Sequence, residues 1–287
     1  MKYAFIQSHA DSHAIYTMCR NLGVSTSGYY DWLERPTSAR DTANQELLTE
    51  IRNIHEQSKQ RYGSPRIHAE LKELGRAVGR KRVERLMQLN DIVAQRSKRH
   101  RRTYTHRETQ LSEENHLNRE FVAKSPNEKW VSDITFIPTR QGWLYLAIVL
   151  DLYSRAIVGW SMSKRINGEL VHDALDMAIN QREIEQGMLV HSDQGSQYTA
   201  QSYREKLTAY GMVCSISRKN ECHDNAVAES FFHTLKEELV YDADYKTHNE
   251  ARQAIFKYIE LFYNRKRRHS YLNYKAPYEY ENMASAA

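Results

Sequence analysis

Residues 130–162 read WVSDITFIPTRQGWLYLAIVLDLYSRAIVGWSM and contain three short apolar runs separated by turn residues. Short runs of β-branched, aromatic and aliphatic residues between turn signals are typical of strands. The pattern predicts strands at Val131–Pro138, Trp143–Leu150 and Ala156–Met162, with Gly142 in the first turn. Because the connections are short, we expect these strands to form an antiparallel meander.

The residues after this meander alternate between helical and strand patterns. Such alternation places helices over a sheet that contains parallel pairs. We therefore predict an α/β fold, a ribonuclease H-like mixed five-stranded sheet with flanking helices. The elements predicted in this part are a helix at Gly168–Gln181, a strand at Met188–Ser192, a helix at Ala200–Tyr210, a strand at Met212–Ser217 and helices from Asn225 and from Asn249.

The first third of the chain shows only helical patterns, so an all-α region precedes the sheet. One helix is predicted within Ser12–Leu22, and a second, capped by Ser25–Ser27, ends before Pro36. Two short helices joined by a tight turn are typical of a helix-turn-helix, although any αα-hairpin has the same spacing. Three further helices are predicted at Asn44–Gln57, from Ser64 and at Arg80–Leu89.

Positive charge is concentrated in this helical region. The whole chain of 287 residues has 41 Lys and Arg against 36 Asp and Glu. Between Arg76 and Arg107, 11 basic residues stand against only Glu84 and Asp91. Such a run favours an anionic partner, and nucleic acid is the leading one. A solvated, flexible linker is the alternative that charge alone leaves open.

The composition excludes several other classes of protein. No apolar run is long enough for a membrane span, and polar residues interrupt the N-terminus too early for a signal peptide. The cysteines, Cys19, Cys214 and Cys222, are too few and too scattered for a disulfide framework or a zinc site. We expect a cytoplasmic protein with no membrane partner.

Three acidic residues are the candidates for chemistry. Asp133 lies within the first strand, Asp193 follows a later strand, and Glu229 lies on a helix with 35 residues between it and Asp193. A carboxylate inside a strand is costly unless it has a partner. Converging carboxylates suit hard divalent cations such as Mg²⁺, and two such ions support in-line phosphoryl displacement.

Other charged residues have structural alternatives. Asp151 is expected to pair with Arg155 in a turn, Asp224 to cap the helix of Glu229, and His191 to be a satisfied strand histidine. The basic run that contains Arg267 and Arg268 is either a cluster favoured by the helix dipole or a patch that contacts phosphates, and we favour phosphate contact.

Several blocks of the chain form a set: Trp130–Thr135, Gly142–Ala147, Asp151–Trp160, His191–Thr199, Asp224–Ala226, Glu229–Lys236, Tyr263–Asn264 and Arg267–Ser270. They resemble the DDE integrase catalytic core of bacterial insertion-sequence transposases, most closely the OrfB type of the insertion sequence 3 family. The likeness runs from about residue 40 to residue 280. Residues Tyr62–Ile67 resemble the helix-turn-helix region of the same proteins.

The resemblance implies cleavage at the ends of an insertion element and transfer of the freed 3′-hydroxyl to another phosphodiester. It implies that Asp133, Asp193 and Glu229 ligate two Mg²⁺ ions, for which Mn²⁺ can substitute. Asn220 stands where the family commonly has glycine, and asparagine tolerates the left-handed backbone that glycine adopts. The residues expected to contact DNA are Lys236, Asn225, Arg66, Arg80, Lys81, Arg267 and Arg268.

The resemblance also sets the expected organisation and partners. We expect a helical DNA-binding region in residues 1–108, a linker in 109–124 and the integrase core in 125–287. The expected partners are double-stranded DNA at the element ends and the target, a second copy of the chain, and an upstream-frame protein joined by fusion or association. Two alternatives stay open: a catalytically silent DNA-binding partner or regulator, and a ribonuclease H-type nuclease that hydrolyses without joining.

Overall fold

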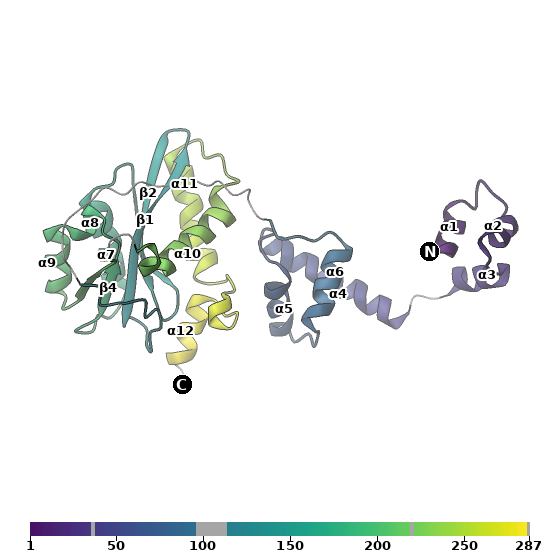
Figure 1. The fold of residues 1–287 in the computed structure, drawn as a ribbon, viewed down its shortest axis with the longest axis horizontal. Helices are drawn as coiled ribbons and strands as arrows, with labels where there is room; N and C mark the ends of the chain where they lie inside the picture. Colours follow the sequence, from purple (N-terminus) through teal and green to yellow (C-terminus); the bar gives the residue numbers. More distant parts are fainter. Residues whose placement is uncertain (36–37, 96–113, 219–220, 286–287) are drawn as a thin grey trace.

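The computed structural model describes residues 1–35, 38–95, 114–218 and 221–285 (Figure 1). Pro36, Asn220 and the basic run between Arg96 and Arg107 lie outside the described residues, so the expectations for them stand as predictions. Between 114 and 128 the chain forms neither a helix nor a strand, and the linker bounds of 109–124 stay a prediction.

The helical region contains two hydrophobic clusters instead of one. Helices α1 (Lys2–Ser8), α2 (Ile15–Leu22) and α3 (Thr26–Glu34) surround a small cluster that includes Tyr29. The hydroxyl of Ser25 accepts a hydrogen bond from the Gly28 N–H at 3.0 Å, which confirms the predicted cap of α3. Helix α1 was not predicted.

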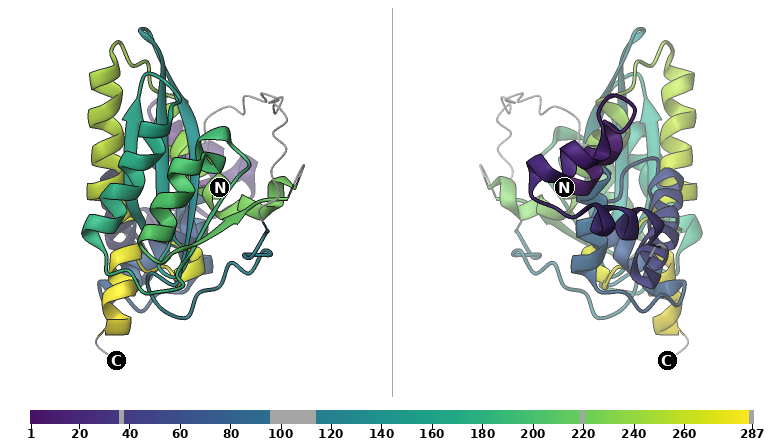
Figure 2. Two further views of the ribbon diagram at one scale, coloured as in Figure 1. Left: turned by 90° about the vertical axis from the view of Figure 1, so that its left-hand side faces the viewer. Right: turned by 90° about the vertical axis from the view of Figure 1, so that its right-hand side faces the viewer.

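The second cluster belongs to α4 (Ala39–Gln57), α5 (Ser64–Glu73) and α6 (Arg80–Leu89). The α6 bounds match the predicted ones, while α4 begins earlier because Ser38 caps it. Helices α5 and α6 are joined by a short turn and form the helix-turn-helix unit with α4 packed behind them. Both helical units lie beyond α10–α12, on the side of the core away from α7–α9 (Figures 1 and 2).

The core domain is built on the predicted mixed five-stranded sheet. The strands are β1 (Lys129–Thr139), β2 (Gly142–Asp151), β3 (Ile157–Ser163), β4 (Leu189–Ser192) and β5 (Val213–Ile216). Their order is β3-β2-β1-β4-β5, with antiparallel pairing among the first three and parallel pairing of β4 with β1 and of β5 with β4. This is the topology of the ribonuclease H-like fold.

Helices cover both faces of the sheet (Figure 1). On one face, α7 (Gly168–Gln181), α8 (Ser196–Thr199) and α9 (Gln201–Ala209) pack on a cluster that includes Trp130. The other face is covered by α10 (Ala226–Leu235), α11 (His248–Phe256) and the helical turns η2 (Lys236–Val240) and η3 (Lys257–Tyr263). The shorter turns η1 (Cys222–Asn225) and η4 (Ser270–Leu272) and helix α12 (Pro277–Ser285) complete the described elements.

Gly159 allows α7 to pack directly on β3. A Cβ at this position would lie 2.2 Å from the Ala174 carbonyl oxygen and 2.8 Å from the Ala178 Cβ. Because the obstacle is helix backbone, relaxation requires that the whole helix move. We therefore expect Gly159→Ala to lower the free energy of unfolding by about 1–3 kcal/mol, measured by urea denaturation. In the matched change Gly168→Ala, the added Cβ would lie 3.8 Å from its nearest neighbour, on His172, so this change should cost less. Equal losses would contradict the close-packing argument.

Candidate active site

The pairing of β1 with β4 places two of the candidate acids side by side. The parallel register ends at Ser132 opposite Ser192, so the next residues of the two strands are Asp133 and Asp193. Neighbouring strands lie about 4.8 Å apart, and residues directly opposite in a parallel pair project to the same face. Two acids that are 60 residues apart in the chain are therefore neighbours in space.

The third candidate acid, Glu229, lies on α10, and its charge affects the Asp133 carboxyl. Glu229 lies in the first turn of this helix with an exposed side chain. The pKa of the Asp133 carboxyl lies well above its usual value, first because the group is desolvated and then because the Asp193 and Glu229 charges oppose its ionisation. The two charge effects require that Asp193 and Glu229 lie near Asp133.

Nearby backbone N–H groups orient the two aspartates. The Ile134 N–H donates to Asp133 Oδ1 at 2.7 Å, and the Gly195 N–H donates to Asp193 Oδ1 at 3.0 Å. Among the residues that the structure describes, no three His, Cys, Asp or Glu side chains are grouped closely enough to form a metal-binding set. Carboxylate oxygens are nevertheless the donors that hard cations prefer, and a bound cation would relieve the charge repulsion that raises the pKa of Asp133.

Lys236 lies beside these acids, at the point where α10 passes into η2. Its ammonium nitrogen is 4.6 Å from the centre of the Phe136 ring, a cation–π contact. Burial lowers the pKa of Lys236, and the negative charge of Asp133 partly opposes this shift. A cation at the edge of the acidic site is suitably placed to contact a DNA phosphate.

Asn225 has a different position from the one expected of a DNA contact. Its side chain is 4% exposed, and the amide nitrogen donates to the Ser132 carbonyl at 3.1 Å. This hydrogen bond ties the start of α10 to β1 immediately before Asp133. We therefore assign Asn225 to the support of the site, because a buried amide bonded to backbone is not presented to DNA.

Tyr198 was missed by the sequence analysis and supports the same strand. The Ser132 hydroxyl donates to the Ile148 carbonyl at 2.7 Å and lies 3.0 Å from the Tyr198 hydroxyl. Since serine has one hydroxyl hydrogen, Tyr198 must be the donor in the second bond. The sequence does show an aromatic residue five positions after Asp193, which could have suggested a role near the site. Its partner on β1, Ser132, could not be predicted from the sequence.

His191 is the satisfied strand histidine that the sequence predicted. Its ring nitrogens lie 2.8 Å from the Ser215 hydroxyl and 3.1 Å from the Ser217 hydroxyl, and the residue is fully buried. Burial lowers its pKa to about 4.

This shift predicts a pH dependence of stability. Between about pH 4 and pH 6.5 the unfolded chain binds a proton at His191 that the folded chain does not, so stability rises with pH in this window. We expect the contribution to span about 2–3 kcal/mol and to disappear in His191→Gln, as measured by urea denaturation across the window. Identical slopes for the two proteins would contradict the assignment.

Two other acids have structural roles, with partners that differ from those predicted. Asp224 does not cap α10. It accepts hydrogen bonds from Arg218 and Arg119, which hold its pKa far below the usual range. Asp151 accepts backbone N–H groups of its own turn, whereas Arg155 donates to the Phe121 carbonyl. Both residues stabilise loops of the core.

The residues predicted to contact phosphates separate into two groups. Arg80 and Lys81 are exposed at the start of α6, where a phosphate could reach them. Arg267 and Arg268 are only 4% and 7% exposed, and both form ion pairs with glutamates. Arg66 also pairs with a glutamate, Glu238, at 3.5 Å. The preference for phosphate contact by Arg267 and Arg268 is therefore corrected, because both guanidinium groups are buried and already engaged by carboxylates.

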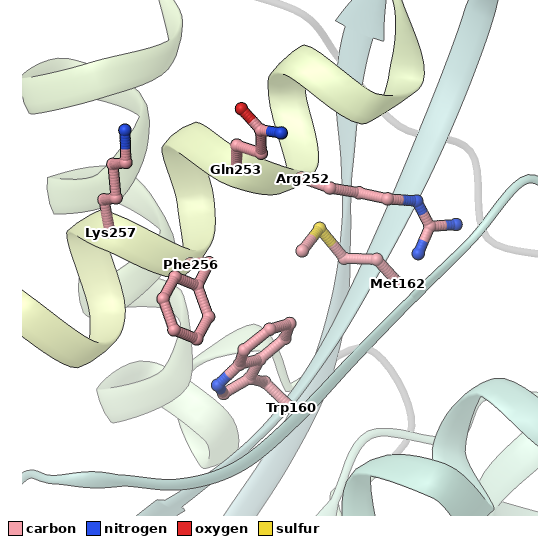
Figure 3. Close-up of a pocket in the computed structure, with 6 residues that line it drawn as sticks. All are labelled: Trp160, Met162, Arg252, Gln253, Phe256 and Lys257. Carbon is pink, nitrogen blue, oxygen red and sulfur yellow. The ribbon is translucent and has the colours of Figure 1, made fainter.

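A shallow groove of about 300 Å³ lies between β3 and α11 (Figure 3). Trp160 and Phe256 form an edge-to-face pair in it, with 6.1 Å between ring centres. The indole N–H of Trp160 donates to Glu260 at 2.8 Å. The groove contains none of the acids of the candidate site; its remaining lining residues are Met162, Arg252, Gln253 and Lys257.

The sheet topology, with Asp133 and Asp193 directly after the paired residues of β1 and β4, is typical of an integrase-type core, and comparisons with known proteins agree. Family models described as "Integrase core domain" match residues 123–222 and 229–284, and an "HTH-like domain" matches 42–101. The chain is 39% identical over 284 residues to "Transposase InsF for insertion sequence IS3A" of Escherichia coli (strain K12), which covers 98% of this chain and 99% of the relative. This chain belongs to the IS3 family of insertion-sequence transposases, which are polynucleotidyl transferases.

Other relatives extend the comparison. The transposase for insertion sequence element IS904 of Lactococcus lactis subsp. lactis (strain IL1403) is 43% identical over 248 residues, with 86% of this chain and 98% of the relative covered. A solved HTLV-2 integrase catalytic core domain in complex with magnesium is 18% identical, with a TM-score of 0.42 over 55% of this chain and 98% of that chain. A simian T-cell lymphotropic virus intasome chain is 13% identical, with a TM-score of 0.48 over 80% and 74%. Among the described residues, no helix has the length and apolar character needed to cross a bilayer.

Proposed function

We propose that this transposase cleaves DNA at the ends of its insertion element and joins the freed 3′-hydroxyl to target DNA, with Asp133, Asp193 and Glu229 as the ligands of two divalent cations. The observation that carries the proposal is the β1–β4 register, which ends at Ser132 opposite Ser192 and so brings Asp133 and Asp193 next in the two segments, with Glu229 close enough to raise the pKa of Asp133. The cations, Mg²⁺ or in its place Mn²⁺, would supply Lewis-acid activation of the attacking and leaving oxygens.

The residues of the chain position the DNA. Lys236 contacts a terminal phosphate beside Asp133, and Arg80 and Lys81 contact backbone phosphates from the start of α6. Asn225 and Tyr198 hold β1 at the level of Asp133, so the carboxylates keep their relative orientation. No protein nucleophile is required, because the attacking group is a water molecule or a DNA hydroxyl.

The proposed partners follow from this reaction. Joining two element ends to one target requires two active sites, so we propose a homo-oligomer, with fusion or association with an upstream-frame protein for additional end recognition. The reaction takes place on nucleoid DNA in the bacterial cytoplasm. These partners are proposed from the chemistry of paired-end recombination.

The test uses the full chain and labelled duplexes that carry the element ends. We expect nicks at the element termini and strand-joined products with Mg²⁺ or Mn²⁺, and no products with EDTA. Hydrolysis of hybrid strands without joining would favour a ribonuclease H-type nuclease. Binding of the ends with no nick in either metal would favour a DNA-binding regulator.

A further inference from the structure

Helix α5 is docked on the catalytic core instead of being free for DNA. Just before this helix, the Tyr62 hydroxyl lies 3.2 Å from the Lys266 carbonyl, to which it donates, and accepts the Arg268 N–H at 2.9 Å. Tyr62 is buried, and burial raises its pKa. The segment that resembles a helix-turn-helix motif therefore forms an interface with the core.

Glu238 is the central residue of this interface. Arg267 donates to its carboxylate through two nitrogens at 2.7–3.0 Å, and the Tyr258 hydroxyl donates at 2.8 Å. From the helical unit, Arg66 reaches the same carboxylate at 3.5 Å and Arg61 donates to the Glu238 carbonyl at 2.9 Å. Burial opposes the ionisation of Glu238, but Arg267 and Arg66 outweigh it, and the pKa lies below its usual value.

A second set of ion pairs lies beside the first. Arg268 donates to both carboxylate oxygens of Glu70 at 2.8 and 2.9 Å, and it also pairs with Glu73 at 2.6 Å. Glu279 of α12 contacts the same guanidinium at 3.2 Å. Arg66, Glu70 and Glu73 have the spacing of a single face of α5, so one face of this helix is used for docking.

The interface is continuous with the catalytic helix. Helix α10 carries Glu229 and passes directly into η2, whose first residue is Lys236 and whose third is Glu238. Lys236 faces the active site, whereas Glu238 faces α5. On the helical side, α5 leads through a short turn to α6, where Arg80 and Lys81 are exposed. Lys236 is therefore two residues from Glu238, and α6 is the next helix after the docked α5.

We propose that Glu238, with Arg66 and Tyr62, is a positioning joint that sets the register between the DNA held by α6 and the acids that act on the scissile bond. This inference rests on the proposed function. If the joint is rigid, the protein fixes the distance between the DNA segment bound by α6 and the phosphodiester that is cleaved. A misplacement of about 1 Å at a reacting centre can cost about 100-fold in rate, so such a joint has a direct effect on cleavage.

The experiment compares two end duplexes, one native and one with five extra base pairs, about half a turn of DNA, between the segment that α6 binds and the scissile bond. For the wild-type chain we expect cleavage to fall about 100-fold on the longer duplex. The double variant Tyr62→Phe, Arg66→Met keeps the Glu238–Arg267 pair and should cleave both duplexes at similar, low rates and at scattered positions. Lys72→Met removes an exposed charge from the same helix and should behave as wild type.

A second readout does not require cleavage. A duplex with an abasic aldehyde at its terminal nucleotide forms an imine with the Lys236 amine, which borohydride reduces to a stable crosslink; Lys236→Gln serves as the blank. The joint predicts crosslinking on the native spacing and little on the longer one, with the preference lost in the double variant. Equal crosslinking of both spacings by the wild-type chain, or full discrimination by the double variant, overturns the inference. Crosslinking with the expected preference but without cleavage supports the joint and counts against the proposed function.

Discussion

Replacing Asp133 or Asp193 by asparagine, or Glu229 by glutamine, should reduce metal-dependent nicking and strand joining by about 1,000-fold or more. An amide has nearly the same volume as the carboxylate but offers no negative charge to a divalent cation. Each variant should therefore fold normally but lose catalytic activity. Affinity for the element ends should change by no more than about threefold, because α6 and its exposed basic residues are unaltered. Gel-shift and cleavage assays on the same end duplex separate the two effects.

Glu237→Gln is the matched control for these variants. Glu237 lies next to Lys236 on η2, but the carboxylates with the main effect on the raised pKa of Asp133 are Asp193 and Glu229. It should therefore retain activity within about threefold of wild type. Full activity in all three carboxylate variants would contradict the proposed active site. Loss of activity in Glu237→Gln alone would indicate that Glu237, and not Glu229, is the third metal ligand.

Arg267→Met should destabilise the protein by about 3–5 kcal/mol, because it removes the main counter-charge of the buried Glu238. The resulting loss should appear as a lower midpoint in urea denaturation. The neighbouring change Arg265→Met affects an exposed guanidinium that donates to a backbone carbonyl, and we expect a loss below about 1 kcal/mol.

The same variant distinguishes an interface residue from a phosphate contact. If Arg267 contacted DNA, its loss would reduce the slope of log affinity against log salt concentration by about one and leave stability nearly unchanged. We expect the opposite: a large change in stability and an unchanged slope. Replacement of both partners, Arg267→Met with Glu238→Leu, should recover part of the stability, since a buried pair of apolar residues carries no desolvation penalty.

Much of the fold could be predicted because its determinants are local. The bounds of α6 and α7 follow from apolar residues at helical spacing and from their flanking residues, and the structure reproduces them. The antiparallel meander follows from runs of strand-forming residues between short turns. Helices α1 and α12 were missed because each is short and its pattern is weak, and the division of the helical region into two clusters was missed because it depends on which helices pack together.

The acids of the candidate site could be predicted from the sequence, but the residues that hold the neighbouring strand in place could not. Asp133, Asp193 and Glu229 stand out because strand ends and helix flanks are unusual places for acids in otherwise apolar segments, and their ligand role remains a prediction. The partners of Ser132, namely Tyr198 and Asn225, are 66 and 93 residues away in the chain. Such pairings depend on how the strands and helices are packed, which no local pattern encodes.

The amino-acid sequence by itself determined the order of helices and strands, the mixed sheet and the three candidate acids. These features could be predicted because hydrophobic periodicity and turn chemistry act over a few neighbouring residues. Tertiary structure alone decided the roles of Arg66, Arg267 and Arg268. An arginine beside other basic residues looks like a phosphate contact until folding brings a carboxylate from a distant segment against it. The local sequence specifies the charge of a side chain, whereas the distant residue that neutralises it is specified only by packing.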